Sequence, residues 1–350
     1  MRLALNLGYQ TAWSTPADHL VLAQEAERLG YSTVWVAEAY GSDAATMLAW
    51  FAGQTSRIEL GSAIFQIPAR TPAMTAMTAA TLDSLSGGRF RLGLGVSGPQ
   101  VSEGWHGVRF GKPLGRTREY VEIVKTALAR KPVEYHGEHY ELPLPDGPGK
   151  ALRLTLHPVR DEIPIYLAAV GPKNLELAGE IADGWLAVFY APEFAAEQAV
   201  HIAAGREKVG KSIEGFDVVA NVPVVVGDDV ASCAELVRNY AALYVGGMGS
   251  RKQNFYNQLA TRMGYGEAAA EVQDLYLAKR HRDAAAAVPM EFIDRTALLG
   301  PVDRIAERMR AYAEAGVTTL SVALFAGDAE DGVRTLRQIG EAYAKSGLAE

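Results

Sequence analysis

The chain has only one cysteine, no excess of basic over acidic residues and no long apolar run. It contains a single cysteine among 350 residues, Cys233, which cannot form an internal disulfide and is expected to be a small buried hydrophobe in a helix. The 41 acidic side chains outnumber the 34 basic ones, giving a formal net charge of −7. This balance argues against nucleic-acid binding, which needs clustered Lys and Arg. The apolar runs are strand-sized, so no membrane span is expected, and the lack of disulfides is typical of a cytoplasmic protein.

The amino-terminal segment also lacks the features of a secretory signal. A short apolar run follows Met1-Arg2, but Asn6 and Gly8 interrupt it and no small-residue cleavage site comes after. We therefore predict a first strand at residues 1–8. The composition, 49% hydrophobic and 21% charged, is that of a globular protein with a large core.

A unit of helix, glycine and strand recurs along the chain. The first helix is predicted to begin at Thr15, a capping residue followed by Pro16 and, three positions on, Asp18; it ends at Gly30. Alternation with helices predicts a parallel sheet, and eight units in this length predict a single domain, 1–350, with an α/β fold of the (β/α)8 TIM barrel type. The predicted strands are 1–8, 32–38, 58–65, 89–95, 163–169, 184–189, 216–226 and 317–325.

Two segments interrupt this alternation and are predicted to be insertions. Residues 131–160 contain the hairpin pattern VEYHGEHYEL, and residues 246–290 run from a glycine-rich stretch into a polar, alanine-rich helix. His136 and His139 in the hairpin have a ligand-like spacing, but no third ligand is evident, so no metal site is predicted.

Residues 93–98, GLGVSG, match the G-x-G-x-x-G fingerprint of dinucleotide binding. A Rossmann turn needs a helix that begins at once, whereas a loop is expected after Gly98, with the next helix near Arg116. In a barrel, Gly93 and Gly95 would face one side of a strand and leave room for a flat ring at the carboxyl end, where barrel active sites lie. The alternative is that these glycines serve barrel packing alone.

One short segment is basic on this acidic chain. Residues 109–118, RFGKPLGRTR, carry Arg109, Lys112, Arg116 and Arg118 and no acidic residue. The segment is either an anion-binding element or a solvated loop.

The chain resembles the bacterial luciferase-like superfamily and, within it, the oxidoreductases that use the deazaflavin coenzyme F420. The resemblance extends over nearly the full length and implies a luciferase-like barrel in which F420 exchanges a hydride at C5 with a small organic substrate, at a C=C, C=N or C=O/alcohol group. The alternatives are an FMN-dependent monooxygenase on the same barrel, a cofactor-binding barrel without turnover, and an unrelated barrel hydrolase. The stretches that carry the resemblance are VWVAEAYGSDA (34–44), LGSAIFQIPARTPAMTAM (60–77), LDSLSGGRFRLGLGVSGPQVSEGWHG (82–107), RTREYVEIV (116–124), AAVGPKNLELAGEIADGW (168–185) and LYVGGMG (243–249).

The same resemblance implies a set of cofactor-binding residues. It places a non-prolyl cis peptide at Ala63-Ile64, against the cofactor ring. Free N–H groups where a helix begins after Gly171 suit a phosphate on physical grounds alone, although an ordinary strand–helix turn is the alternative. The full set is Gly61, Ser62, Ala63, Ile64, Val96, Ser97, Gly98, Ala168, Ala169, Val170 and Gly171, with Arg116 and Arg118 for the acidic tail of F420.

The acid–base groups depart from one branch of the family. Sugar-phosphate dehydrogenases of the family carry an Asp-His pair and a Glu where this chain has Glu38, Ala39 and Gly98, so sugar-phosphate oxidation is not expected. Glu38, His106 and Glu103 are the predicted catalytic residues; Glu38 is preferred because it is a carboxylate at the end of a barrel strand. The alternatives are that Glu38 is a structural residue that accepts hydrogen bonds, and that His106 is a loop residue without a catalytic role.

The residues around the expected mouth of the barrel should set substrate choice. The 246–290 insertion is expected to be a lid or wall over a small-molecule substrate, or part of a homodimer interface. The predicted substrate-pocket residues are Tyr9, Trp13, Tyr40, Gln66, Trp105, Met248 and Phe255, and the insertion also offers Asn254, Arg262 and Tyr265.

Overall fold

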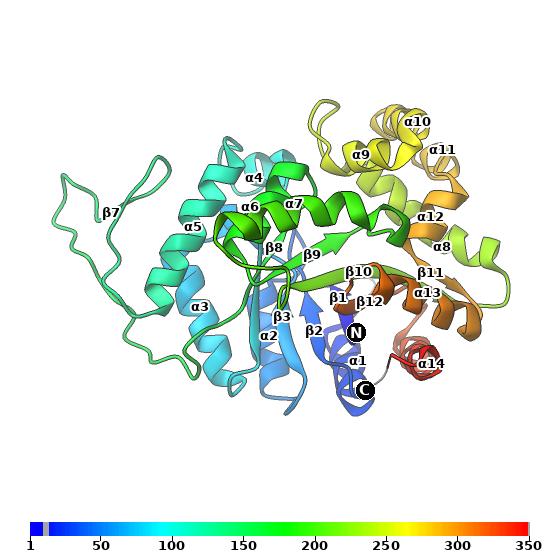
Figure 1. Cartoon of the computed structure of the whole chain (residues 1–350), viewed down its shortest axis with the longest axis horizontal. Coiled ribbons are helices and arrows are strands. Elements are labelled where there is room, and N and C mark those ends of the chain that lie inside the picture. Colours follow the sequence, from blue (N-terminus) through cyan, green and yellow to red (C-terminus); the bar gives the residue numbers. More distant parts are fainter. Residues whose placement is uncertain (10–13, 349–350) are drawn as a thin grey trace.

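The structure, a computed structural model, describes residues 1–9 and 14–348, and a closed barrel of parallel strands lies at its centre (Figure 1). The strands pair in the order β1-β2-β3-β5-β8-β9-β10-β12, and β12 pairs with β1 to close the ring. The predicted (β/α)8 barrel is confirmed. Its strands are β1 (Arg2–Gly8), β2 (Thr33–Val36), β3 (Glu59–Ser62), β5 (Phe90–Gly95), β8 (Ile165–Ala168), β9 (Gly184–Val188), β10 (Asp217–Val226) and β12 (Thr319–Leu324).

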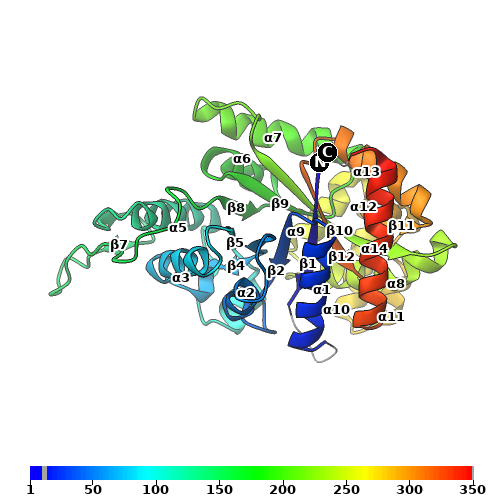
Figure 2. The same cartoon turned by 90° about the horizontal axis from the view of Figure 1, so that it is seen from below.

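Helices surround the barrel, as the view in Figure 2 shows. The predicted capping box of the first helix is present: the Thr15 hydroxyl accepts from the Asp18 N–H at 3.2 Å, and the Asp18 carboxylate accepts from the Thr15 N–H at 2.8 Å. The helices pack on the strands over one large apolar core, so most strand residues are buried. The outer helices are α1 (Pro16–Arg28), α2 (Ala44–Ala52), α3 (Pro72–Leu85), α5 (Pro113–Leu128), α6 (Pro172–Ile181), α7 (Ala195–Lys208), α8 (Val230–Ala242), α13 (Val302–Glu314) and α14 (Ala329–Ser346).

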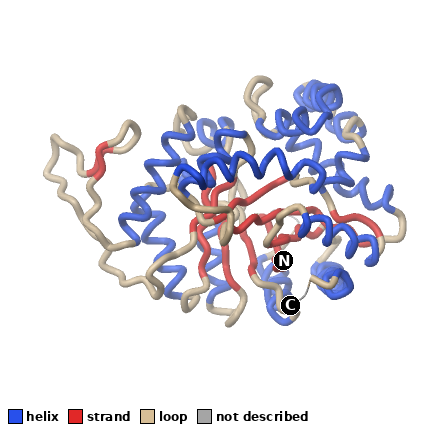
Figure 3. The backbone as a smooth tube through the Cα atoms, viewed as in Figure 1, coloured by secondary structure: helices blue, strands red, loops and turns tan. Residues whose placement is uncertain are grey.

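The two insertions differ in character. In the first, β6 (Tyr135–His136) pairs antiparallel with β7 (Glu141–Leu142), and this predicted hairpin projects away from the barrel as a mostly irregular loop (Figure 3). The second insertion was expected to hold one helix but holds several, which build an apolar core of their own with α8. Its elements, with the π-helical turn that leads into it and the helix after it, are η3 (Leu243–Gly247), α9 (Phe255–Ala260), η4 (Thr261–Tyr265), α10 (Gly266–Leu277), α11 (His281–Ala286) and α12 (Met290–Thr296).

Three elements differ from the prediction. The helix α4 (Pro99–Gly104) begins directly after Gly98, where a loop was expected, because proline suits the first position of a helix. The closed barrel, and not the lack of a helix, therefore excludes a Rossmann fold. In addition α5 begins at Pro113 rather than near Arg116, and an unpredicted strand, β11 (Leu298–Gly300), extends the sheet beside β10. The remaining short elements are β4 (Phe65–Gln66), η1 (Ile67–Ala69) and η2 (Pro192–Phe194).

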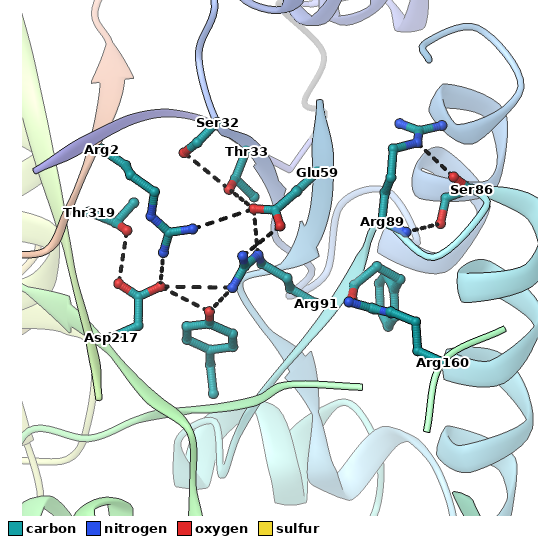
Figure 4. A network of polar contacts seen from close by, with 12 residues as sticks. Arg2, Ser32, Thr33, Glu59, Ser86, Arg89, Arg91, Arg160, Asp217 and Thr319 are labelled. Atoms are coloured by element: carbon teal, nitrogen blue, oxygen red, sulfur yellow. Dashed lines mark hydrogen bonds and ion pairs between the residues drawn. The ribbon is translucent and has the colours of Figure 1, made fainter. Parts of the chain in front are cut away.

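A polar network closes the amino-terminal end of the barrel (Figure 4). The Asp217 carboxylate accepts hydrogen bonds from Thr319 at 2.8 Å and from Tyr166 at 2.9 Å, and it forms an ion pair with Arg2. The Arg91 guanidinium pairs with Glu59. Burial alone would raise the pKa of Asp217, but Arg2 and the hydroxyl donors hold this pKa below its ordinary value.

An apolar layer lies above this network in the barrel interior. It consists of Ala4, Trp35, Tyr166, Leu186 and Val219, all nearly inaccessible to solvent. The layer separates the polar end from the carboxyl end of the strands, which we call the mouth. Ligand chemistry is therefore expected at the mouth, as in other barrels of this kind.

Candidate functional site

Three small apolar residues form a half-exposed surface at the mouth. Ala63 and Ile64 come from the segment between β3 and β4, and Ala168 ends β8; all three pack on the apolar layer of the barrel interior. The Ala63–Ile64 peptide bond is cis, as the resemblance implied. We call these three residues the apolar platform. A flat, mostly apolar ring is the kind of group that such a surface accommodates.

Gly93 and Gly95 do not leave room for a ring, contrary to the prediction. A Cβ on Gly93 would lie 1.9 Å from the Ser62 carbonyl oxygen, and one on Gly95 would lie 2.6 Å from Ile64 Cδ1. The space freed by the missing side chains is filled by the protein itself. These glycines let the β3 segment and the platform pack closely on β5, which is the packing alternative.

Three of the predicted cofactor residues lie inside the barrel wall, which disfavours their assignment to the cofactor. A Cβ on Gly61 would lie 2.2 Å from the Trp35 ring, so the glycine accommodates that ring. The Ser62 hydroxyl donates to the Gly93 carbonyl at 2.8 Å and accepts from the Gly93 N–H at 2.9 Å. Ala169 is 2% exposed. These residues support the platform from below and are not available to contact a ligand.

The start of α6 is open at the same end of the barrel. Gly171 is the N-cap residue, no side chain caps it, and a Cβ there would meet no atom within 4 Å. Arg262, from the second insertion, donates to the Val170 carbonyl at 2.9 Å. Its buried Nε makes no hydrogen bond among the described residues but forms a longer ion pair, 3.8 Å, with Glu197. Exposed backbone N–H groups next to a guanidinium make this helix start suitable for an anion such as a phosphate.

The segment after β5 forms the next part of the rim. Val96, Ser97 and Gly98 are half-exposed, as expected for residues at the mouth. Ser97 has a positive φ of 59°, which turns the chain from the strand into α4. These three residues remain candidates for ligand contact.

Glu38 is the preferred catalytic residue of the sequence analysis, but its surroundings favour a structural role. One carboxylate oxygen accepts from the Gln66 N–H at 3.0 Å and from Arg70; the other accepts from Arg70 at 2.9 Å and from the Ala44 N–H at 3.3 Å. A carboxylate has about four acceptor positions, and all are occupied here. The Arg70 guanidinium also pairs with Asp43. These contacts favour the structural alternative over the predicted acid–base role: the residue ties the segment after β4 to the end of β2.

His106 is held at the mouth through Gln66. The Gln66 amide nitrogen donates to the Glu38 carbonyl at 2.9 Å, so its oxygen is the atom that lies 2.7 Å from His106 Nε2. An amide oxygen can only accept, so Nε2 carries a proton and Nδ1 is the nitrogen left to exchange one. His106 is half-buried and no partner for Nδ1 is found among the described residues. The predicted pocket residue Gln66 thus fixes the tautomer of a candidate acid–base group.

Glu103, the third predicted catalytic residue, is bound to its own loop. Its side chain is exposed and accepts a hydrogen bond from the Phe110 N–H at 2.9 Å, so it stabilises the loop that follows α4. Phe110 in turn lies against Phe255 of the second insertion, with ring centroids 6.4 Å apart. This contact brings the second insertion to the rim at the predicted pocket residue Phe255.

The other predicted pocket residues are less enclosed. Tyr40 and Trp105 are 56% and 66% exposed. Tyr9 is half-buried with its ring 6.3 Å from that of Tyr40, and Met248 is half-buried. Trp13 lies outside the described residues.

The basic segment 109–118 acquires acidic partners in the fold. Arg118 forms a two-pronged ion pair with Glu180 of α6 at 2.7 Å, and Lys112 pairs with Glu138 of the hairpin. Arg116 donates to the Arg109 carbonyl at 3.2 Å. Arg118 is thus already neutralised, which weakens its assignment to the cofactor tail, whereas Arg116 has no acidic partner among the described residues.

A group of tyrosines at the mouth was missed by the sequence analysis. Tyr240 and Tyr244 lie on one face of α8 and η3, with ring centroids 4.7 Å apart, and Tyr256 of α9 lies 4.8 Å from Tyr244. Phe325, directly after β12, lies 5.7 Å from Tyr240. The spacing of four residues between Tyr240 and Tyr244 was the signal available in the sequence. We call Tyr240, Tyr244 and Tyr256 the tyrosine wall.

No group of three His, Cys, Asp or Glu side chains in the described part of the chain could hold a metal ion; His136 of the hairpin pairs with Glu141. Among the helices that the structure describes, none is both long and apolar enough to cross a membrane. Cys233 is buried and unpaired, as expected.

Known proteins resemble this chain over most of its length. It is 46% identical over 337 residues to a Mycobacterium tuberculosis protein named as a coenzyme F420-dependent oxidoreductase, covering 94% of this chain and 96% of that one. It is 31% identical over 299 residues to the 5,10-methylenetetrahydromethanopterin reductase of Archaeoglobus fulgidus, covering 84% and 85%. The fold matches the coenzyme F420 dependent tetrahydromethanopterin reductase of Methanopyrus kandleri with a TM-score of 0.82, 24% identity and 98% coverage of both chains. The luciferase-like monooxygenase family matches residues 2–319. The chain therefore belongs to the luciferase-like monooxygenase family, as the resemblance in the sequence implied.

Proposed function

We propose that the protein is an F420-dependent oxidoreductase that moves a hydride between C5 of the deazaflavin and a small organic substrate. The observation that carries this proposal is the apolar platform next to the open start of α6. A flat ring on Ala63, Ile64 and Ala168 would leave a phosphate within reach of the α6 backbone, and the names of the relatives favour F420 as that ligand.

The residues present fit such a cofactor. When bound, F420 supplies the two-electron hydride chemistry. The platform would hold the ring, and the backbone at Gly171 with the guanidinium of Arg262 would bind the phosphate. Arg116, which lacks an acidic partner among the described residues, is the candidate for the acidic tail.

His106 is the group we propose for proton transfer at the mouth. Gln66 accepts from Nε2 and fixes the orientation of the ring, so Nδ1 would give or take the proton that accompanies hydride transfer. In the reducing direction the proton goes to the substrate; in the oxidising direction it returns to His106. No other residue is assigned this role, because the carboxylates of Glu38 and Glu103 are engaged elsewhere.

His106→Gln should lower kcat by about 100-fold, the lower end of the range for lost acid–base catalysis. The Kd for F420 should change little, since the residue is not part of the platform or the α6 start. The measurements are steady-state kinetics across pH with a substrate found by screening, and F420 titration. The control is His157→Gln, an exposed histidine of the first insertion. An unchanged kcat and pH profile in the His106 variant would remove the residue from the mechanism.

The proposed cofactor is tested by fluorescence titration of the purified protein with F420 and, separately, with FMN. We expect binding of F420 in the micromolar range or tighter and weaker binding of FMN. Arg262→Met should raise the Kd for F420 about tenfold or more, because a charge-assisted contact to phosphate is lost. Arg251→Met is the matched control, since Arg251 lies on the same insertion but pairs with Asp274 at the surface. Tighter binding of FMN would favour the flavin monooxygenase alternative instead.

A further inference from the structure

The tyrosine wall lies at the mouth on the side formed by β10 and β12. Phe325 follows β12 and packs on Tyr240, and Phe189, at the end of β9, lies 5.5 Å from Tyr244 and 6.1 Å from Tyr256. The wall, carried by α8, η3 and α9, therefore packs on residues that follow β9 and β12, and neither strand is a neighbour of β3 or β5 in the strand order. A ring bound on the apolar platform would have one face toward Ala63 and Ile64, and the wall borders another part of the same mouth.

Unpartnered polar atoms lie below the wall on the same two strands. Asn221 of β10 and Ser321 of β12 are register neighbours, two residues beyond Val219 and Thr319, whose side chains reach the barrel interior. Side chains two apart on a strand share a face, so Asn221 and Ser321 also face inward. Ser321 is completely buried, and neither its Oγ nor the Oδ1 of Asn221 has a hydrogen-bond partner among the described residues.

Burial and neighbouring phenols dominate the electrostatics of the wall. Burial raises the pKa of Tyr256 to about 12 and shifts the pKa values of Tyr240 and Tyr244 upward as well. The next causes for Tyr240 and Tyr244 are other tyrosines. By contrast, charged residues act on Tyr265 of the same insertion. The phenols are therefore neutral donors, and a charged molecule placed against them would lose its hydration without gaining a counter-charge.

We propose that the tyrosine wall, with the half-buried Asn221 beneath it, is the substrate subsite, and that it takes an uncharged ring-shaped carbonyl compound. Aromatic or alicyclic rings would pack on Tyr244 and Tyr256, and the carbonyl oxygen would accept a hydrogen bond from the Asn221 amide. This inference rests on the proposed function, because it names the class of substrate that meets the cofactor. It distinguishes this protein from the relatives named as 5,10-methylenetetrahydromethanopterin reductases.

The test uses the full-length protein, with and without oxidised F420, and three probes of similar shape. Indanone is an uncharged bicyclic ketone, indane lacks the carbonyl, and indanone carboxylate adds a charge. Binding is measured by calorimetry, which needs no turnover. We expect indanone to bind about tenfold or more tightly than the carboxylate, because burying an uncompensated charge is costly. Indanone should also bind about fivefold more tightly than indane, through the buried hydrogen bond.

Variants separate the two parts of the subsite. Tyr256→Leu keeps apolar bulk and should weaken indanone binding about fivefold through lost aromatic packing. Asn221→Leu, which keeps the size of the side chain and removes its amide, should abolish the preference for indanone over indane. Tyr135→Phe, in the distant hairpin, is the control. Folding of each variant is checked by its thermal transition.

The possible outcomes are distinct. Equal or tighter binding of the carboxylate, or unchanged binding in folded Tyr256→Leu and Asn221→Leu proteins, would overturn the subsite. If F420 does not bind but the probes and variants behave as expected, the proposed function fails while the subsite stands. If F420 binds but the variants do not change the binding of the probes, the subsite fails while the proposed function stands.

Discussion

Replacing Glu38 by glutamine should reduce the free energy of unfolding by about 4 kcal/mol, the cost of breaking a buried ion pair. The side chains of Glu38 and Arg70 are 9% and 12% exposed, so water cannot replace the lost partner. An amide at this position would also direct N–H groups at the guanidinium and at backbone donors, where two oxygens now accept. The segment between β4 and α3 should loosen first, because Glu38 holds it to β2.

Chemical denaturation measures this loss, and Glu235→Gln serves as the control. Glu235 is 62% exposed and pairs with Arg238 on the surface of α8, so its replacement should cost under about 1 kcal/mol. The kcat of the folded Glu38 variant should stay within about tenfold of the parent, since no proton passes through a saturated carboxylate. Normal stability together with a kcat lowered 100-fold or more would instead restore Glu38 as an acid–base residue.

Replacing Asp217 by alanine should reduce the free energy of unfolding by about 3 kcal/mol. The effect is smaller than for a fully buried pair because its partner Arg2 keeps 41% of its side-chain surface exposed. The hydroxyls of Thr318, Thr319 and Tyr166 would lose their common acceptor at the closed end of the barrel. The mouth lies beyond the apolar layer, so F420 binding by the folded variant should be unchanged.

The same carboxylate makes a defined contribution to the pH dependence of stability. Its pKa is lower in the folded protein than in the unfolded chain, so the stabilisation is fully present above the ordinary Asp pKa, about 3.9. It disappears as the pH falls through the lower, folded value. The difference in thermal midpoint between the parent and Asp217→Asn should therefore be constant near neutral pH and shrink below about pH 4. A difference that grows on acidification would contradict this assignment.

The elements with clear local signals in the sequence form where they were predicted. The capping residues at Thr15 and Asp18 and the strand pattern at residues 184–189 are local signals, and both elements form where predicted. The helix after Gly98 was missed because the preceding glycines and serine favour a turn, yet Pro99 begins α4 there. The short strand β11 could not be predicted from its own three residues, because it forms only by pairing with the end of β10.

For the site, the sequence identified Ala63, Ile64, Ala168 and Gly171 through a resemblance, and the structure places all four at the mouth. The prediction that Gly93 leaves room for a ring was wrong, because the space beside this glycine depends on how closely β3 approaches β5. The roles of these residues as ligand contacts stay predictions.

By itself the sequence determined the barrel, because the eight barrel strands and the main helices between them are encoded by periodicity and capping within a few residues. It also determined the family, because the matching stretches are spread over the whole chain. Only the tertiary structure decided which charges are free. Glu38 is taken by Arg70, 32 residues away, and Arg118 by Glu180, 62 residues away. The tyrosine wall likewise joins α8 to an insertion. Such pairings follow from packing between elements, and no local pattern of residues encodes them.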